Sequence, residues 1–286
     1  MTTTTDFSQI DSKLRSATLL RSNRMTAEKS SEDVRELKFR TRDPGFNPVP
    51  GQCIRIMAPG QFGNRYHPRF YSLADVEKPS PDTIEFTVCV RRCFVLDDFN
   101  GERYAGVASN YLCDLPIGSG IEFAGPVGYP FAPPADRKSN VLMIGMGTGI
   151  APFRGLVRAI YEQLPRWEGQ VRLFYGARSG LEMLYMNDEN RDLAVYFDQP
   201  SFKAFQAMSP RPAFNAPAAL DRAIEENAAE VWSLLQAQGT HVYIAGTQAM
   251  LEPINNVLGK LAGTRAALDS LRRTMAGERR WAEILY

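Results

Sequence analysis

The sequence has few of the residues that build metal centres and no long apolar segment. It contains two histidines and four cysteines, and the cysteines show neither CxxC nor ferredoxin-type cluster spacing. We therefore expect no metal site and interpret the cysteines as buried thiols of a cytoplasmic protein. No apolar run approaches the roughly 18–20 residues of a membrane-spanning helix, so we expect no transmembrane segment.

Excess charge is also absent, since 33 Lys and Arg side chains stand against 32 Asp and Glu side chains, for a net charge of +1. This balance argues against nucleic-acid binding through bulk charge. The first residues, MTTTTDFSQ, lack the apolar centre of a signal peptide, and we interpret residues 1–14 as a flexible polar arm. The 44% hydrophobic content is sufficient for the core of one large or two medium-sized domains.

The first half of the chain has the punctuation of a β protein. Short β-rich runs separated by Gly, Pro, Asn and Asp predict strands at residues 34–40, 52–58, 69–74, 83–92 and 119–125. Strands at such regular intervals predict a barrel or a sandwich. Residues 109–115 interrupt them and are typical of a short helix, with Ser109 as its N-cap.

The second half alternates between buried strands and helices. The proline-rich stretch 130–140 marks a boundary that we place after residue 135. Strands are predicted at 141–147, 170–178 and 240–246, and helices at 151–164, 180–193, 221–238, 248–263 and 266–277. Residues 196–218 fit no regular pattern and are predicted to form a long irregular loop. This alternation predicts a parallel sheet with helices on both faces.

A glycine-rich turn, GMGTGIAPFRG (145–155), joins the first strand of this half to its first helix. Gly145, Gly147 and Gly149 leave room for a ligand to approach the backbone, and Pro152 suits the first turn of a helix. The N–H groups at such a helix start attract phosphate. The turn departs from the GxGxxG pattern of ordinary Rossmann dehydrogenases, and a tight turn without a ligand remains the alternative.

The stretch HPRFYSLAD (67–75) brings together a cation, an aromatic ring and a hydroxyl. We expect Arg69, Tyr71 and Ser72 to point the same way from an extended strand. On its own, this pattern is equally consistent with a half-buried strand that carries an incidental arginine.

Taken together, several stretches resemble the plant-type ferredoxin–NADP reductase family over roughly residues 15–286. They are RFYS (69–72), CVRR (89–92), GVASNYLCDLPIGSGIEFAGPVG (106–128), GTGIAPFRG (147–155), THVYIAGTQAMLE (240–252) and the terminal RRWAEILY. Reductase components of oxygenases, which share the fold, are a second resemblance. The resemblance implies an antiparallel FAD-binding β-barrel at 1–135, followed by a parallel-sheet nicotinamide-binding α/β domain at 136–286.

The resemblance also assigns flavin-binding residues. Arg69 is expected at the FAD pyrophosphate, Tyr71 along the flavin and its ribityl chain, and Ser72 near the flavin N5, where it takes part in catalysis. The remaining FAD-binding residues implied by the family are Gly106, Val107 and Ser109 at the pyrophosphate, and Cys89, Val90 and Arg91 at the adenosine side and the nicotinamide entrance.

On the nicotinamide side, the resemblance assigns residues of the glycine turn and of the C-terminus. Thr148, flanked by Gly147 and Gly149, is expected to orient the nicotinamide. Tyr286 is expected to stack on the isoalloxazine, and Glu283 is the candidate for a catalytic proton relay, although it stands one position earlier than the family's acidic residue.

Three departures from the family pattern bear on ligand binding. AVYFD (194–198) stands where the family has a Ser-Arg pair for the NADP 2′-phosphate, and Asp198 would repel a phosphate. This leaves open a preference for NADH, binding of the adenosine half by Arg178, Lys203 or Arg211, or a lost nicotinamide site. Ala245 replaces the cysteine expected beside the nicotinamide. Val95, next to Phe94, replaces a tyrosine that stacks on the adenine of FAD.

The resemblance predicts an FAD-dependent oxidoreductase that transfers electrons between NADPH or NADH and a ferredoxin- or flavodoxin-like carrier. The carrier must be a separate protein because the chain has no iron–sulfur motif. A basic rim could dock it, formed by Arg21, Arg24, Arg65, Arg91, Arg92 and Arg154. Two alternatives stay open: the reductase component of an oxygenase system, and an FAD-binding electron-transfer subunit that does not use nicotinamide.

Overall fold

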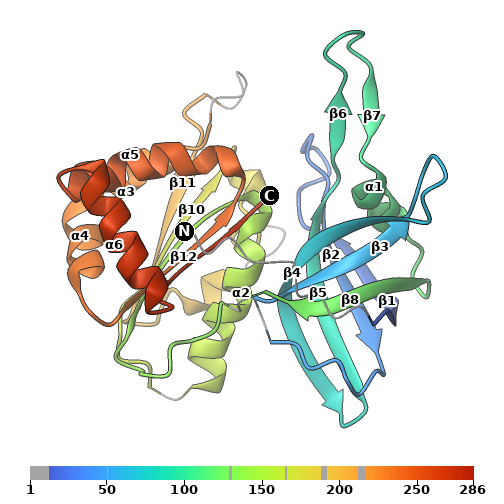
Figure 1. The fold of residues 1–286 in the computed structure, drawn as a ribbon, viewed down its shortest axis with the longest axis horizontal. Coiled ribbons are helices and arrows are strands. Elements are labelled where there is room, and N and C mark those ends of the chain that lie inside the picture. The colour runs from blue at the N-terminus through green and yellow to red at the C-terminus, as the bar shows by residue number, and fades with distance from the viewer. Residues whose placement is uncertain (1–12, 50, 129–130, 165, 188–191, 212–216) are drawn as a thin grey trace. The chain divides into compact units, whose positions relative to one another are not determined.

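The computed structural model describes residues 13–286 except 50, 129–130, 165, 188–191 and 212–216 (Figure 1). The predicted N-terminal arm therefore lies almost entirely outside the described residues. Contacts divide the chain between residues 130 and 131, slightly before the expected boundary. Within the described part, no helix is long and apolar enough to cross a membrane.

The first unit is a closed antiparallel barrel, as predicted. The strand order is β1–β2–β5–β4–β3–β8. The bounds are β1 Arg15–Arg24, β2 Val34–Thr41, β3 Cys53–Pro59, β4 Tyr66–Ser80, β5 Thr83–Arg91 and β8 Gly120–Val127. Strand β1 was not predicted, because its sequence, RSATLLRSNR, turns only Ala17 and Leu19 fully toward the core among largely polar neighbours.

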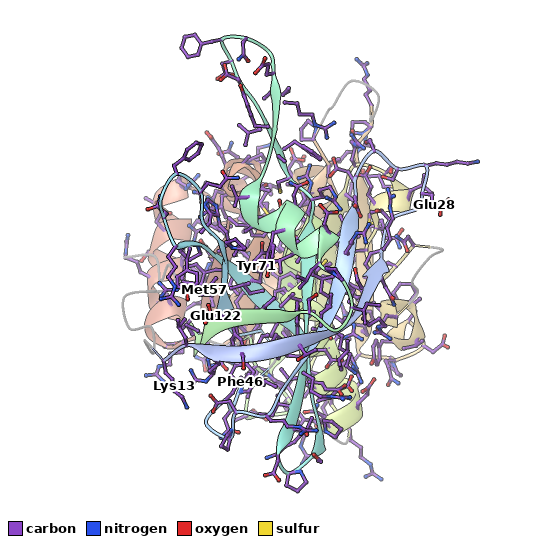
Figure 2. The ribbon with its side chains drawn as sticks, turned by 90° about the vertical axis from the view of Figure 1, so that its right-hand side faces the viewer. Lys13, Glu28, Phe46, Met57, Tyr71 and Glu122 are labelled. Atoms are coloured by element: carbon purple, nitrogen blue, oxygen red, sulfur yellow. The ribbon has the colours of Figure 1, made fainter. Side chains whose placement is uncertain are left out.

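Aromatic rings fill the barrel. Phe86 stacks on Phe39 at 5.6 Å between centroids and meets Phe46 edge-on at 5.4 Å. Phe46, labelled in Figure 2, also packs against Phe123 at 5.0 Å. These buried rings give the barrel a core of its own.

A hairpin and a helix interrupt the barrel strands. Strands β6 (Phe94–Leu96) and β7 (Arg103–Ala105) pair with each other, and their hairpin projects from the barrel in Figure 1. Helix α1 (Val107–Asp114) follows directly. Its N-cap is Gly106, so the prediction of Ser109 as N-cap is wrong, because the helix begins as soon as the hairpin closes.

The second unit contains a parallel five-stranded sheet in the order β11–β10–β9–β12–β13. The strands are β9 Asn140–Met146, β10 Val171–Ala177, β11 Phe202–Met208, β12 Thr240–Gly246 and β13 Trp281–Leu285. The longer helices are α2 Ile150–Arg158, α3 Leu220–Glu226, α4 Ala228–Gln236, α5 Leu251–Leu261 and α6 Arg265–Gly277. The four helices α3, α4, α5 and α6 share one hydrophobic core with one face of the sheet. Helix α2 packs Phe153 on Gly145 from the other face.

Two predictions in this unit are wrong. Of the predicted helix 180–193, the described residues form only 3₁₀ turns, η3 (Gly180–Glu182) and η4 (Asp192–Tyr196). The predicted irregular loop 196–218 contains the edge strand β11. Strand β11 escaped notice because only Phe202 and Ala207 of its seven residues are buried, so its hydrophobic alternation is weak.

Candidate functional site

The start of α1 forms a compact cradle in the barrel unit. The Gly106 N–H donates to the Cys93 carbonyl at 2.9 Å, and the Ser109 hydroxyl accepts from the Cys93 N–H at 3.1 Å. A Cβ on Gly106 would lie 3.0 Å from the Ser109 Oγ and 3.1 Å from the Cys93 carbonyl oxygen, so the close approach favours glycine. The first-turn amides of Val107 and Ala108 lack intrahelical partners and suit a phosphate.

Strand β4 brings Arg69 and Tyr71 onto one face, but not Ser72. The β3–β4 ladder pairs Arg69 with Ile56, Tyr71 with Ile54 and Ser72 with Cys53 in regular register. Because side chains alternate along a strand, Ser72 points the other way, and its Oγ lies 3.5 Å from the Cys53 Sγ. The expectation that all three share a face is therefore wrong.

Tyr71 lies where β4 meets α1, and it is labelled in Figure 2. It packs against the barrel core, as Tyr111 and Leu115 do from α1 and the residue after it. Burial raises the pKa of Tyr71, the thiols of Cys113 and Cys93 raise it further, and the Arg69 guanidinium opposes them. Tyr71 is thus a neutral phenol close to α1, to Cys93 and to Arg69.

The Arg69 guanidinium donates to the neighbouring Pro68 carbonyl at 2.8 Å. Among the described residues, it forms no ion pair with a carboxylate. A planar fork of donors on β4, a strand that also contacts α1, fits a diphosphate. The residues present therefore fit the diphosphate and flavin of FAD.

The three predicted cofactor residues on β5 have side chains that are either buried or paired with a carboxylate. Cys89 and Val90 are buried, and burial raises the pKa of the Cys89 thiol, helped by Glu36. Arg91 pairs with Glu32 at 2.5 and 3.0 Å. The β4–β5 ladder ends at the Leu73–Val88 pair, so this stretch offers a ligand its backbone rather than its side chains.

The projecting hairpin carries an aromatic residue that sequence reasoning missed. Tyr104 lies directly opposite Val95, on a face separate from Phe94. The Phe94 ring is covered by the Arg103 guanidinium at 3.6 Å, whereas Tyr104 is 49% exposed. Its hydroxyl donates to Glu102 and accepts from the Asn100 amide at 3.4 Å. The register of the hairpin was the signal that could have revealed it.

In the α/β unit, the glycine turn is held against the end of β12. A Cβ on Gly149 would lie 2.1 Å from the Ala245 carbonyl oxygen, which leaves room for hydrogen alone. Gly147 has a φ of 56°, in the left-handed region that favours glycine. Its carbonyl accepts from the Tyr175 hydroxyl at 3.0 Å. The turn leads directly into α2, so its shape sets the position of the helix start.

Thr148 and Tyr286 meet at this turn. Their hydroxyl oxygens lie 2.6 Å apart, and the Tyr286 N–H donates to the Gly246 carbonyl at 3.1 Å. Tyr286 is nevertheless 59% exposed. The structure therefore brings together Gly147, Thr148, Gly149 and Tyr286, whereas stacking of Tyr286 on the isoalloxazine stays a prediction.

Glu283 is not part of this group. Its Oε1 accepts from the Trp281 indole N–H at 2.7 Å and lies 3.6 Å from the Arg272 Nε. Arg272 belongs to α6, so the carboxylate is engaged on the helical face of β13, and Glu283 is 8% exposed. This environment suits a structural role.

The segment 194–198 does not lie at the end of a strand. Tyr196 donates its hydroxyl to Glu162 and stacks on Tyr161 at 5.6 Å, next to the last turn of the α2 helical segment. Because α2 returns to the start of the sheet, this is the amino edge. Ligands of such sheets bind at the carboxyl edge, so Asp198 is not placed to repel a 2′-phosphate.

Other residues follow the carboxyl end of β11. Ser209 is buried, and its hydroxyl accepts from the Arg211 N–H at 3.2 Å. Lys203 lies at the opposite end of β11 and pairs with Glu230 at 3.4 Å, and Arg178 pairs with Glu182 at 2.6 Å. Of these three residues, only Arg211 both lies at the carboxyl edge of the sheet and forms no ion pair with a described carboxylate.

Most arginines of the expected basic rim are neutralised by carboxylates. The pairs are Arg21–Glu36, Arg24–Asp33, Arg91–Glu32, Arg92–Asp33, Arg92–Asp114 and Arg154–Asp192. Arg65 instead lies over the Tyr66 ring at 4.8 Å. The rim is therefore less basic than the sequence suggests.

Comparison with known proteins agrees with both units. The family model "Oxidoreductase NAD-binding domain" matches residues 143–256. A ferredoxin–NADP reductase of Spirulina sp. is 31% identical over 253 residues, covering 85% of each chain. One of Picosynechococcus sp. is 30% identical over 269 residues, covering 91% of this chain and 66% of the relative. The chain thus spans about two thirds of the length of the first curated relatives, or slightly less.

A solved structure shows the same fold. The ferredoxin–NADP⁺ reductase of Plasmodium falciparum superposes with a TM-score of 0.69 at 16% identity, covering 96% of each chain. From the extent and identity of the sequence matches, the chain belongs to the plant-type ferredoxin–NADP reductase family.

Proposed function

We propose that this protein is an FAD-dependent oxidoreductase that transfers electrons between NADPH and a ferredoxin- or flavodoxin-like carrier. The observation that carries the proposal is the position of Tyr71, close to the Arg69 guanidinium and to Cys93, which accepts a hydrogen bond from Gly106 at the start of α1. The curated relatives are named ferredoxin–NADP reductases, which supports the same activity.

Each part of FAD has residues that would hold it. The Arg69 guanidinium and the first amides of α1 would bind the diphosphate, and the neutral phenol of Tyr71 would pack along the flavin side. Tyr104 would stack on the adenine, replacing the ring that position 95 lacks. When bound, FAD accepts a hydride from a nicotinamide and releases electrons singly, while the protein fixes distance and access.

Residues of the α/β unit would receive the nicotinamide nucleotide. The start of α2 would bind its diphosphate, with Gly149 keeping the turn close to β12. Thr148 would orient the nicotinamide once its hydroxyl leaves Tyr286. Tyr286 would cover the Thr148 hydroxyl until the nucleotide arrives. Ser72 faces away from Arg69 and Tyr71 and Glu283 is held by Trp281, so we assign neither a catalytic step.

We further propose that NADPH is preferred over NADH. Arg211 follows the carboxyl end of β11 and forms no ion pair with a described carboxylate, and the buried Ser209 hydroxyl lies beside it. A guanidinium and a hydroxyl together suit a phosphate on the ribose. A Plasmodium reductase of this fold has been solved with 2′P-AMP, a ligand that carries such a phosphate.

An alternative function would differ only in the protein that receives the electrons. A reductase serving one oxygenase component would share this fold and this chemistry. The names of the curated relatives favour a ferredoxin as the carrier.

An anaerobic two-donor test examines the proposal. The purified protein should be yellow, and NADPH should bleach it within seconds, faster than NADH. A ferredoxin added afterwards should be reduced. Replacement of Arg211 by Met should slow flavin reduction by NADPH about 10-fold, since charge-assisted hydrogen bonds contribute about 1.5–3 kcal/mol. The rate of reduction by NADH should not change. A yellow protein that dithionite reduces and neither nucleotide reduces would instead identify a flavin subunit without nicotinamide chemistry.

A further inference from the structure

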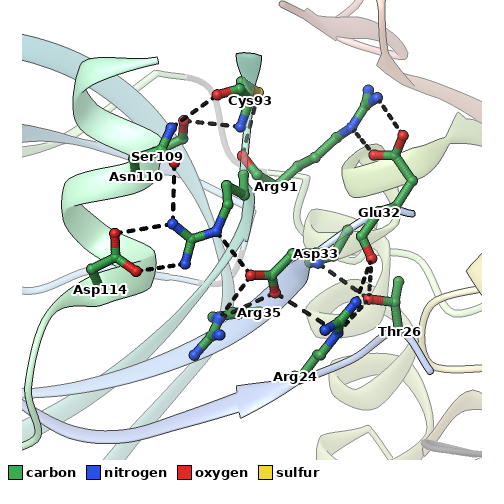
Figure 3. A network of polar contacts seen from close by, with 12 residues as sticks. Arg24, Thr26, Glu32, Asp33, Arg35, Arg91, Cys93, Ser109, Asn110 and Asp114 are labelled. Atoms are coloured by element: carbon green, nitrogen blue, oxygen red, sulfur yellow. Dashed lines mark hydrogen bonds and ion pairs between the residues drawn. The ribbon is translucent and has the colours of Figure 1, made fainter. Parts of the chain in front are cut away.

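A network of charged side chains surrounds α1, and Figure 3 shows it. The Arg92 guanidinium binds both oxygens of Asp114 at 2.7 and 3.0 Å. It also donates to Asp33 at 2.9 Å and to the Asn110 Oδ1 at 3.1 Å. We call Asp33, Arg92, Asn110 and Asp114 the α1 clamp. Arg92, which directly follows β5, thus links the loop between β1 and β2 to α1.

Asn110 continues this connection to the start of the helix. Its amide nitrogen donates to the Gly106 carbonyl at 2.8 Å and to the Cys93 carbonyl at 2.9 Å. The hydrogen bond from Arg92 to the amide oxygen fixes which way the amide points. Arg92 therefore holds Gly106 through Asn110, at the point where the open amides of α1 begin.

The guanidinium is occupied by protein groups. Its four hydrogen bonds go to Asp33, Asn110 and Asp114, and the side chain is 16% exposed. Such a group is not placed to bind a nucleotide itself. Its geometry instead fixes the atoms around a phosphate-binding helix start.

We propose that Arg92 is a positioning residue for the FAD diphosphate, acting through Asn110 on the first amides of α1. This rests on the proposed FAD binding. The neighbouring Arg91 does not have this role, because its guanidinium pairs with Glu32. Amides that are fixed in advance bind a ligand without an ordering cost.

The matched control is Arg35. It pairs with the same Asp33, at 3.1 and 3.3 Å, and its own contacts run through Asp33 rather than to Asn110. Arg35→Met therefore removes an ion pair from the same carboxylate while leaving the connection to Gly106 intact.

The experiment measures the dissociation constant of FAD for the apoprotein, from the fluorescence lost on binding. Arg92→Met should weaken FAD binding roughly 10- to 100-fold, in line with hydrogen bonds to charged groups, and Arg35→Met less than about 3-fold. Asn110→Ala should reproduce most of the loss, and the double variant Arg92→Met/Asn110→Ala should lose little more. Losses that multiply in the double variant, or equal losses in Arg92→Met and Arg35→Met, would overturn the proposal.

A spectroscopic readout separates positioning from general stability. The ³¹P resonances of the bound FAD diphosphate should shift in Arg92→Met and stay in place in Arg35→Met. If Arg92→Met fails to fold, Arg92→Lys takes its place, since it keeps the charge and loses the fork. Wild-type protein that binds no FAD would contradict the proposed function. Tight binding by both variants with unshifted resonances would contradict only the positioning role of Arg92.

Discussion

Each of the two units has a helix start that we propose as a ligand site, and the two starts are held in place by different means. In the barrel, Arg92 and Asn110 fix α1 through charged and polar side chains. In the α/β unit, the turn before α2 is fixed by the close approach of Gly149 to the Ala245 carbonyl and by a hydrogen bond from the Tyr175 hydroxyl to the Gly147 carbonyl. A tyrosine hydroxyl also rests on that second turn, at Thr148.

This difference fits the different times for which the two proposed ligands stay bound. A resident cofactor gains from a binding site that ion pairs hold ready, because no ordering is needed when it binds. A nucleotide that arrives and leaves in every cycle needs a turn that is sterically fixed but covered only by a side chain that can move. The exposed Tyr286 is such a side chain.

The strongest test of this contrast is Gly149→Ala. The new Cβ would overlap the Ala245 carbonyl oxygen, so the turn must shift. A displacement of about 1 Å at such a site costs on the order of 100-fold in rate, and we expect that loss in NADPH-dependent flavin reduction, measured by stopped flow. FAD binding, in the other unit, should be unchanged. Gly277→Ala, whose Cβ meets nothing within 4 Å, is the control and should behave as wild type.

The next effect is expected for Arg69→Ala. Removing the guanidinium should weaken FAD binding about 10- to 100-fold, as expected for charge-assisted hydrogen bonds. Equilibrium titration of the apoprotein measures it. Arg42→Ala removes another exposed arginine of the barrel unit and serves as control. Equal affinities of these two variants would remove Arg69 from the diphosphate site.

Tyr104→Ala should have a smaller and more selective effect. Stacking of a base on an aromatic side chain contributes about 1–3 kcal/mol, so FAD should bind on the order of 10-fold more weakly. FMN has no adenine, and its affinity should not change. Phe94→Ala should affect FAD less, because Arg103 covers that ring. A parallel loss of FMN affinity in Tyr104→Ala would point to a disturbed hairpin instead.

Sequence reasoning succeeded where local pattern and structure agree. Alternation predicted most barrel strands, and the glycine spacing predicted the turn that Gly149 fixes. It did not predict that the Thr148 hydroxyl lies 2.6 Å from that of the C-terminal tyrosine. Steric requirements of this kind leave a direct mark on the residue types.

The failures arise where partners distant in sequence decide. The segment AVYFD contains good strand formers, yet Tyr196 is fixed by Tyr161 and Glu162, so it turns beside α2. Neighbouring Arg91 and Arg92 look equivalent in sequence. Only the fold shows that one pairs with Glu32 and the other holds α1.

The smallest predicted effect concerns acid. Burial alone would raise the pKa of Asp33, but hydrogen bonds from Arg92 and Arg35 outweigh it and lower the pKa. Hydrogen bonding from Arg92 likewise lowers the pKa of Asp114. A carboxylate whose pKa is lowered by folding stabilises the fold at pH values above its pKa in the unfolded chain, which is about 4. That contribution is lost as the pH falls through the lower folded-state pKa.

The free energy of unfolding should therefore differ between wild type and Arg92→Met at pH 7 by on the order of 1 kcal/mol, since Asp114 is mostly exposed and screened. The gap should narrow as the pH falls below about 4, where protonation removes the same ion pairs in the wild type. Urea unfolding of the apoproteins across this range measures it. Because the glycine turn carries no such ion pair in its described contacts, Gly149→Ala should show a gap that does not depend on pH. A constant gap for Arg92→Met would mean that shape, and not charge, holds both helix starts.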